Sequence, residues 1–174
     1  MRSLVDAPKI REFMRALGSC LRAQTRVYLV GGVSAVLEGW RPSTVDLDLK
    51  IVPDEEVFGE LSRLKEQLNV NIELAAPDQF IPPLPGWEAR STFVTREGQV
   101  DFYHFDFYSQ ALAKIERGFE RDLGDVREMV RRSLIEPVRA LELFEAVESQ
   151  LIRYPAIDPP SFRRAVEDVF AGGC

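Results

Sequence analysis

The sequence is poor in the residues that build disulfide frameworks and zinc sites. It contains two cysteines and one histidine. Cys20 and Cys174 lie far apart in the chain and show no metal-ligand spacing. Neither a disulfide-stabilised fold nor a structural zinc site is therefore expected.

Long apolar runs and an excess of basic charge are also missing. No run approaches the ~18 apolar residues of a membrane span, and the N-terminus has no apolar signal core, so we expect no membrane association and a cytoplasmic protein. Lys and Arg number 22 against 28 Asp and Glu, a formal net charge of −6. This balance argues against a broad DNA-binding surface and leaves open RNA or a nucleotide on a local basic patch.

What is present is an ordinary globular composition, with 45% hydrophobic and 29% charged residues. A chain of this kind can bury its own core. We expect residues 1–108 to form an α/β core and residues 109–174 a helical part packed on it as one unit.

The most informative stretch is an apolar run, Val27–Val30, that ends in Gly31-Gly32 and precedes a second apolar run carrying Asp46 and Asp48. Residues two apart in a strand point to the same face, so the two carboxylates should project side by side, with Val45, Leu47 and Leu49 packed behind them. Neighbouring carboxylates repel unless a cation lies between them. Hard divalent cations, Mg²⁺ or Mn²⁺, suit such oxygen ligands.

Periodicity and turn residues predict the other elements. We expect Asp6 to cap a helix over 6–23. We expect Pro53-Asp54 to cap a second helix, with Val57 on its apolar stripe, and Ser161 to cap a short last helix. Strands are expected at 26–30, 45–52 and 69–75, and a hairpin at 90–95 and 99–105 with its turn at 96–98. A short helix should occupy 33–38 and a proline-rich loop 81–87. Further helices should follow Ser109 and Pro137, and Gly118 is a candidate break in the first of these.

The Gly-Gly element fits one of three known phosphate-binding patterns. It is not a Walker A loop, because no Gly-Lys-Ser/Thr follows, and it lacks the third glycine of a dinucleotide fingerprint. The remaining interpretation is a glycine junction that holds phosphates beside an acidic pair that holds a metal. Metal-assisted nucleotidyl transfer needs this combination, because charge on the reacting phosphate must be neutralised.

These residues resemble a known superfamily. The signature of the DNA polymerase beta-like nucleotidyltransferases resembles Gly31-Gly32 followed by Asp46-Leu47-Asp48. The AbiEii-like branch of that superfamily is similar in its motif to Arg41-x-Ser43-Thr44-x-Asp46. This branch includes toxins of toxin–antitoxin and phage-defence systems. Lys114 with Arg121-Asp122-x-x-Asp125 resembles the second signature of that branch, and the closest likeness is to small bacterial proteins. The resemblance covers roughly residues 26–130 and implies an α+β fold, a mixed β-sheet flanked by helices with a helical C-terminal part.

The resemblance also implies roles for individual residues. Asp46 and Asp48 would bind the metals, with Glu73 the best-placed third carboxylate and Asp122 its rival in a catalytic role. The NTP would be held by Gly31, Gly32, Ser34, Arg41, Thr44 and Lys114. On a continuous helix Lys114 and Asp125, eleven residues apart, would share one face.

Each of these residues also has a purely structural interpretation. Asp46 and Asp48 could form a solvated strand face, Glu73 could be a surface residue, and Asp122 and Asp125 could hold Arg41 or Arg121 in a salt bridge. His104 is better explained as a packed or surface imidazole than as a general base.

Three functions remain open at this point. The first is a Mg²⁺-dependent nucleotidyltransferase that moves a nucleoside monophosphate from an NTP to an RNA acceptor such as tRNA, or to a protein. The resemblance implies a toxin–antitoxin or phage-defence role for such an enzyme. The second is an antitoxin-type transferase that modifies a partner toxin. The third is a nucleotide-binding module that has lost turnover.

Overall fold

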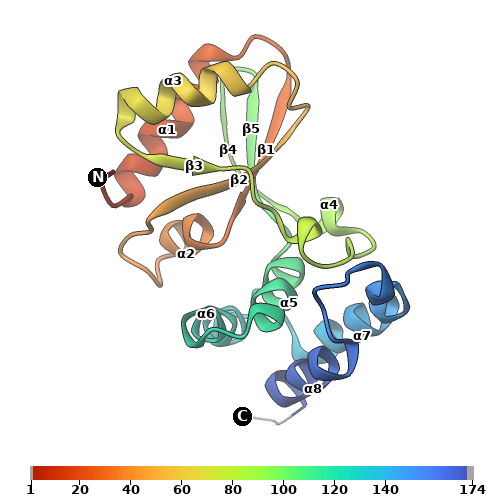
Figure 1. Cartoon of the computed structure of the whole chain (residues 1–174). Helices are drawn as coiled ribbons and strands as arrows, with labels where there is room; N and C mark the ends of the chain where they lie inside the picture. Colours follow the sequence, from red (N-terminus) through yellow and green to blue (C-terminus); the bar gives the residue numbers. More distant parts are fainter. Residues whose placement is uncertain (1, 172–174) are drawn as a thin grey trace. The chain divides into compact units, whose positions relative to one another are not determined.

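The computed structural model describes residues 2–171, which form an α+β structure (Figure 1). Its strands are β1 (Thr25–Val30), β2 (Asp46–Val52), β3 (Asn71–Glu73), β4 (Thr92–Glu97) and β5 (Val100–His104). The helices are α1 (Ala7–Cys20), α2 (Gly32–Glu38), α3 (Phe58–Leu68), α4 (Trp87–Arg90), α5 (Phe107–Arg117), α6 (Glu120–Arg131), α7 (Pro137–Val147) and α8 (Pro159–Phe170). Short 3₁₀ helices occupy Pro77–Gln79 (η1) and Glu148–Arg153 (η2). None of the helices in this range is long and apolar enough to cross a bilayer.

The chain divides into two compact units, described here one at a time. Within the described residues, the first contains 2–76 together with 91–105, and the second contains 77–90 together with 106–171. The sheet belongs to the first unit. The proline-rich segment 77–90 belongs to the second, with the C-terminal helices.

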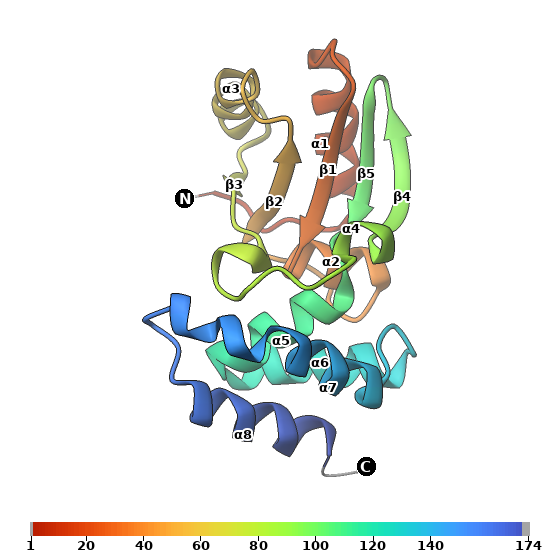
Figure 2. The same cartoon turned by 90° about the vertical axis from the view of Figure 1, so that its right-hand side faces the viewer.

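The first unit is built on a five-stranded mixed sheet of order β3-β2-β1-β5-β4. The central strand β1 runs antiparallel to β2 and parallel to β5, and Figure 2 shows the arrowheads of β1 and β2 pointing in opposite directions. The edge strand β3 pairs parallel with β2, while β4 pairs antiparallel with β5. The predicted fold class, a mixed sheet with flanking helices and a helical C-terminal part, is confirmed.

The core of the first unit lies between one face of the sheet and helices α1 and α3, which contact each other. The buried side chains at its centre include Phe13 and Leu17 of α1, Leu64 of α3, and Leu47 and Leu49 of β2. Asp6 caps α1 as predicted, because its side chain accepts a hydrogen bond from the Lys9 backbone amide. The predicted site residues Asp46 and Asp48 of β2 and Glu73 of β3 alternate with buried core residues and lie on the opposite face of the sheet.

Several predicted details of this unit are wrong. Val45 precedes β2 and is 55% exposed, so it does not pack behind the aspartates. Helix α3 begins at Phe58 without a side-chain cap, because residues 54–57 form a turn instead of a first helical turn. The hairpin turn falls at Gly98-Gln99 and not at 96–98, since the positive φ that the turn needs is supplied by Gly98 (φ 59°).

The second unit contains helices α5 to α8. Gly118 ends α5 in a left-handed conformation (φ 72°), so the helical run after Ser109 breaks at the glycine named from the sequence and forms two helices. Helix α8 has twelve residues and is capped by Asp158, which accepts from the Ser161 backbone amide; the predicted cap at Ser161 is therefore wrong by three positions. Phe144 of α7 packs edge-on against Phe162 of α8, with ring centroids 5.1 Å apart.

Candidate functional site

The two aspartates of β2 lie side by side on the sheet face opposite α1 and α3. Along β2, Leu47, Leu49 and Ile51 are buried in the core, and the alternate positions Asp46 and Asp48 are half-buried. This alternation is the period-2 pattern of a strand with one buried face. The predicted common orientation of the two carboxylates follows from it.

Strand pairing brings Glu73 to the same place. Val30 of β1 pairs with Asp48, and Asp48 pairs with Glu73 of β3, so these three positions form one row across the sheet. Asp46 pairs with Asn71 in the next row. Positions paired across neighbouring strands share a face of the sheet. Asp46, Asp48 and Glu73 therefore occupy adjacent positions on the same face. Glu73 is the most exposed of the three.

Asn71 links two of these carboxylates. Its side-chain amide nitrogen donates to Asp46 Oδ1 at 2.7 Å and to Glu73 Oε1 at 3.1 Å. In the sequence, Asn71 is only a polar position two residues before Glu73 in the strand expected at 69–75. Its role depends on the β2–β3 register, which the sequence does not reveal.

The Gly31-Gly32 turn joins the end of β1 to this row. Gly31 has φ +63°, a conformation that L side chains rarely adopt, and a Cβ at this position would lie 3.4 Å from Asp48 Oδ2. The backbone of the turn therefore runs beside the Asp48 carboxylate. The two halves of the predicted site are neighbours in the structure.

Gly32 is required by the close approach of Thr44. A Cβ on Gly32 would lie 2.1 Å from Thr44 Oγ1, closer than any real contact. Thr44 is 7% exposed, its backbone pairs with Val5, and its hydroxyl donates to the Asp46 carbonyl at 3.3 Å. In this conformation Thr44 supports the start of β2. Arg41 lies half-buried in the connection between α2 and β2, where its backbone amide donates to the Ala35 carbonyl.

Ser34, predicted to hold phosphate, is fully buried in a polar network. Its hydroxyl donates to the Leu29 carbonyl at 3.1 Å and lies 2.9 Å from His104 Nδ1. The other ring nitrogen of His104 lies 3.1 Å from Glu38 Oε1. Burial lowers the pKa of His104 from 6.5 to about 4, so the imidazole is neutral at pH 7. His104 is thus a packed imidazole, as expected, and it ties β5 to both ends of α2.

Lys114 and Asp122 belong to the second unit, where they form a buried charged cluster with Asp125. Lys114 Nζ lies 2.7 Å from Asp125 Oδ2 and 3.3 Å from Asp122 Oδ1, and Arg117 Nε lies 3.1 Å from Asp122 Oδ2. Lys114 is thus a partner of both aspartates, and Arg117 is a second partner of Asp122. Lys114 is 8% exposed. Its ammonium group could contact a phosphate only if it left these carboxylate partners.

The donor set on β2 and β3 fits a hard divalent cation held partly by its substrate. Asp46 and Asp48 offer carboxylate oxygens from one strand face, with Glu73 beside them. Mg²⁺ is commonly held by one or two carboxylates, with water and phosphate oxygens completing its shell. Within residues 2–171, no group of three or more His, Cys, Asp or Glu side chains is placed to close around an ion unaided.

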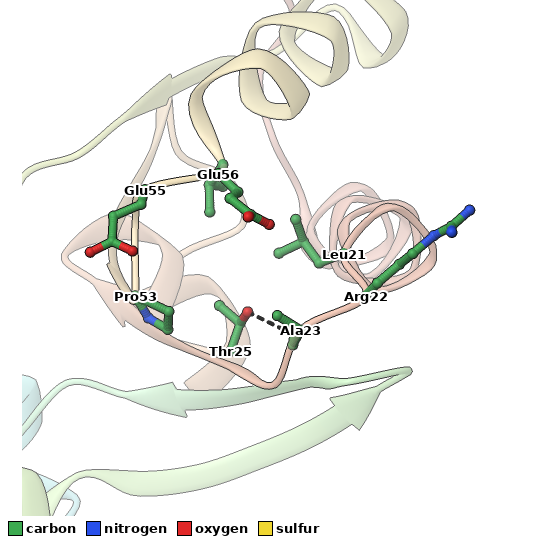
Figure 3. Close-up of a pocket in the computed structure, with 8 residues that line it drawn as sticks. Leu21, Arg22, Ala23, Thr25, Pro53, Glu55 and Glu56 are labelled. Atoms are coloured by element: carbon green, nitrogen blue, oxygen red, sulfur yellow. Dashed lines mark hydrogen bonds between the residues drawn. The ribbon is translucent and has the colours of Figure 1, made fainter.

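A cavity of about 190 Å³ lies at the other end of the same strands (Figure 3). It is lined by Leu21, Arg22, Ala23, Thr25, Pro53, Glu55, Glu56 and Val57. Thr25 begins β1 and Pro53 follows β2, whereas Gly31 and Asp46 lie at the opposite ends of these strands. The cavity is therefore separate from Asp46, Asp48 and Glu73, which together are called the carboxylate row below.

Comparisons with known proteins agree with this geometry. A family model described as "Nucleotidyltransferase of unknown function (DUF6036)" matches residues 8–150. The crystal structure of an antigenic nucleotidyltransferase-like protein from Paracoccidioides brasiliensis is similar in fold, with a TM-score of 0.53 at 15% identity over 97% of this chain and 100% of that one. Comparison with curated proteins gives no match.

Proposed function

Since the chain belongs to the DUF6036 family of nucleotidyltransferases of unknown function, we propose that it transfers a nucleoside monophosphate from an NTP to an RNA or protein acceptor with Mg²⁺ or Mn²⁺. The observation that carries the proposal is the carboxylate row on the polar sheet face. Asp46 and Asp48 project from one strand face, and the Gly31 backbone passes beside Asp48.

The residues of this row would divide the work of binding. Asp46 and Asp48 would hold the metal, and Glu73 would add negative charge from the neighbouring strand. Gly31 has no side chain that would block a triphosphate approaching beside Asp48. When bound, the metal would neutralise charge on the phosphate oxygens during displacement at the α-phosphorus.

The test is transfer of label from α-³²P-labelled NTPs to total tRNA or to lysate protein, with Mg²⁺ or Mn²⁺. Asp46→Asn and Asp48→Asn remove one negative charge each without changing shape, and we expect each to reduce transfer by at least 100-fold. Asp54→Asn is the matched control, because Asp54 is an exposed aspartate beyond the far end of β2. Equal transfer by all four proteins would overturn the assignment of the site.

A second candidate function is nucleotide binding without turnover. The exposed position of Glu73 favours it, because the third carboxylate is less enclosed than Asp46 and Asp48. Binding of an NTP that depends on Asp46, without transfer to any acceptor, would select this function. Growth arrest on expression, lost in the Asp46→Asn variant, would instead support a toxin role, and rescue of growth beside a partner toxin would support an antitoxin role.

A further inference from the structure

Asn71 occupies a central position among the acidic side chains of the carboxylate row. Its register partner is Asp46, and Glu73 lies two residues further along the same strand face. Both hydrogens of its amide group are used, one on the Asp46 carboxylate and one on the Glu73 carboxylate.

The electrostatic consequence is direct. Three acidic side chains on adjacent strand positions repel one another, which favours rotamers that carry the carboxylates apart. A neutral donor placed between two of them offsets part of that repulsion and fixes the orientation of each carboxylate. Without it, Glu73 would be an exposed side chain on a three-residue edge strand, with few constraints on its rotamer.

We propose that Asn71 is a positioning residue of the metal site, which holds Asp46 and Glu73 ready for a divalent cation. This inference rests on the proposed function, because it assumes that the carboxylate row binds metal. Residues that orient metal ligands change affinity by roughly 10- to 100-fold when they are removed. Asn71 would thus affect metal affinity without touching the metal.

Mn²⁺ titration of the whole protein tests this without any activity measurement. We expect Asn71→Ala to weaken Mn²⁺ binding by about tenfold or more. Gln67→Ala is the matched control, since Gln67 carries the same amide on an exposed position of α3 and should leave the affinity unchanged. Wild-type affinity in Asn71→Ala would overturn the inference.

Asn71→Asp separates positioning from simple packing. The substitution keeps the side-chain size but replaces the donor with another negative charge. We expect a lower Tm than wild type without metal and a larger rise in Tm on addition of Mn²⁺, because the cation relieves the added repulsion. A Tm deficit that Mn²⁺ leaves unchanged would show a merely structural role and contradict the inference.

The Asp46→Asn and Asp48→Asn variants distinguish the two possible failures. If they lose Mn²⁺ binding while Asn71→Ala keeps it, Asn71 has no positioning role and the proposed metal site stands. If they too bind Mn²⁺ as the wild type does, or if the wild type binds none, the metal site itself is wrong.

As an independent sign of proximity, Mn²⁺ should broaden the side-chain NH₂ resonances of Asn71 and spare those of Gln67. Equal broadening of both would count against the inference.

Discussion

At the scale of single residues, His104 shows how burial sets a protonation state. The ring lies between Ser34 Oγ and Glu38 Oε1, and His104 is 4% exposed. Desolvation disfavours the imidazolium and lowers the pKa of His104 to about 4. The neutral ring holds β5 against α2, the helix that follows the Gly31-Gly32 turn.

This burial predicts a loss of stability on mild acidification. Between pH 6.5 and pH 4 the unfolded chain protonates His104 and the folded chain does not, so the unfolded state binds more protons and the free energy of unfolding falls as pH falls. From pH 7 to pH 5 the loss from this group should be roughly 2 kcal/mol. Urea unfolding at a series of pH values measures it.

The attribution to His104 is testable because it is the only histidine. His104→Asn should lower stability at every pH and flatten the slope between pH 5 and 7. Lowered carboxyl pKa values, such as that of Asp101 beside Arg96, act at more acidic pH. A slope that stays as steep in the variant would show that another group causes it.

The same scale shows what the sequence could and could not predict about the site. Asp46 and Asp48 were placed correctly because strand alternation is a local property of β2. The bridging contacts of Asn71 and the buried network of Ser34 depend on pairing between strands distant in sequence. Neither residue type nor spacing encodes that pairing, so these contacts were missed.

At the scale of elements, the pair α5 and α6 brings Lys114 together with Asp122 and Asp125. A continuous helix was expected to align Lys114 and Asp125 across three turns. Gly118 instead ends α5, and α6 packs back against it, which places Nζ 2.7 Å from Asp125 Oδ2. The spacing predicted only that the two residues would share a helix face, whereas their contact is a tertiary one between two helices.

This cluster predicts that Lys114 is needed for stability. Lys114→Met would leave two buried carboxylates without their ammonium partner, and we expect a loss of roughly 3–5 kcal/mol in the free energy of unfolding. Arg127→Ala is the control, because the Arg127–Glu120 pair on α6 has side chains 62% and 83% exposed and should contribute less than about 1 kcal/mol. Urea denaturation measures both.

A further variant separates charge burial from packing. In the triple variant Lys114→Met/Asp122→Asn/Asp125→Asn, neutral amides replace both carboxylates. Its free energy of unfolding should therefore be higher than that of Lys114→Met alone. If Lys114→Met were as stable as the wild type but lost nucleotidyl transfer, Lys114 would instead make the phosphate contact that the resemblance implies.

At the scale of the whole molecule, the two units do not follow the order of the chain. Residues 77–90 interrupt the sheet unit in sequence but belong structurally with the helices after residue 106. Arg90 forms two hydrogen bonds to the Asp106 carboxylate, at 3.1 and 2.8 Å, and η1 packs on α5. The expected boundary at 108 came from the change to helical periodicity, which carries no information about where an earlier loop packs.

This division predicts which segments unfold together. In native-state hydrogen exchange, the amides of 77–90 should open with α5–α8 and not with their chain neighbours β3 and β4. Arg90→Ala should lower protection in 77–90 and α5 by roughly 1.5–3 kcal/mol, because Asp106 is 1% exposed and loses a charged partner. Arg96→Ala is the counterpart in the sheet unit, where Arg96 pairs with Asp101 between β4 and β5, and it should lower protection there alone. If residues 77–90 exchanged together with the sheet in all three proteins, the assignment of this segment to the helical unit would be wrong.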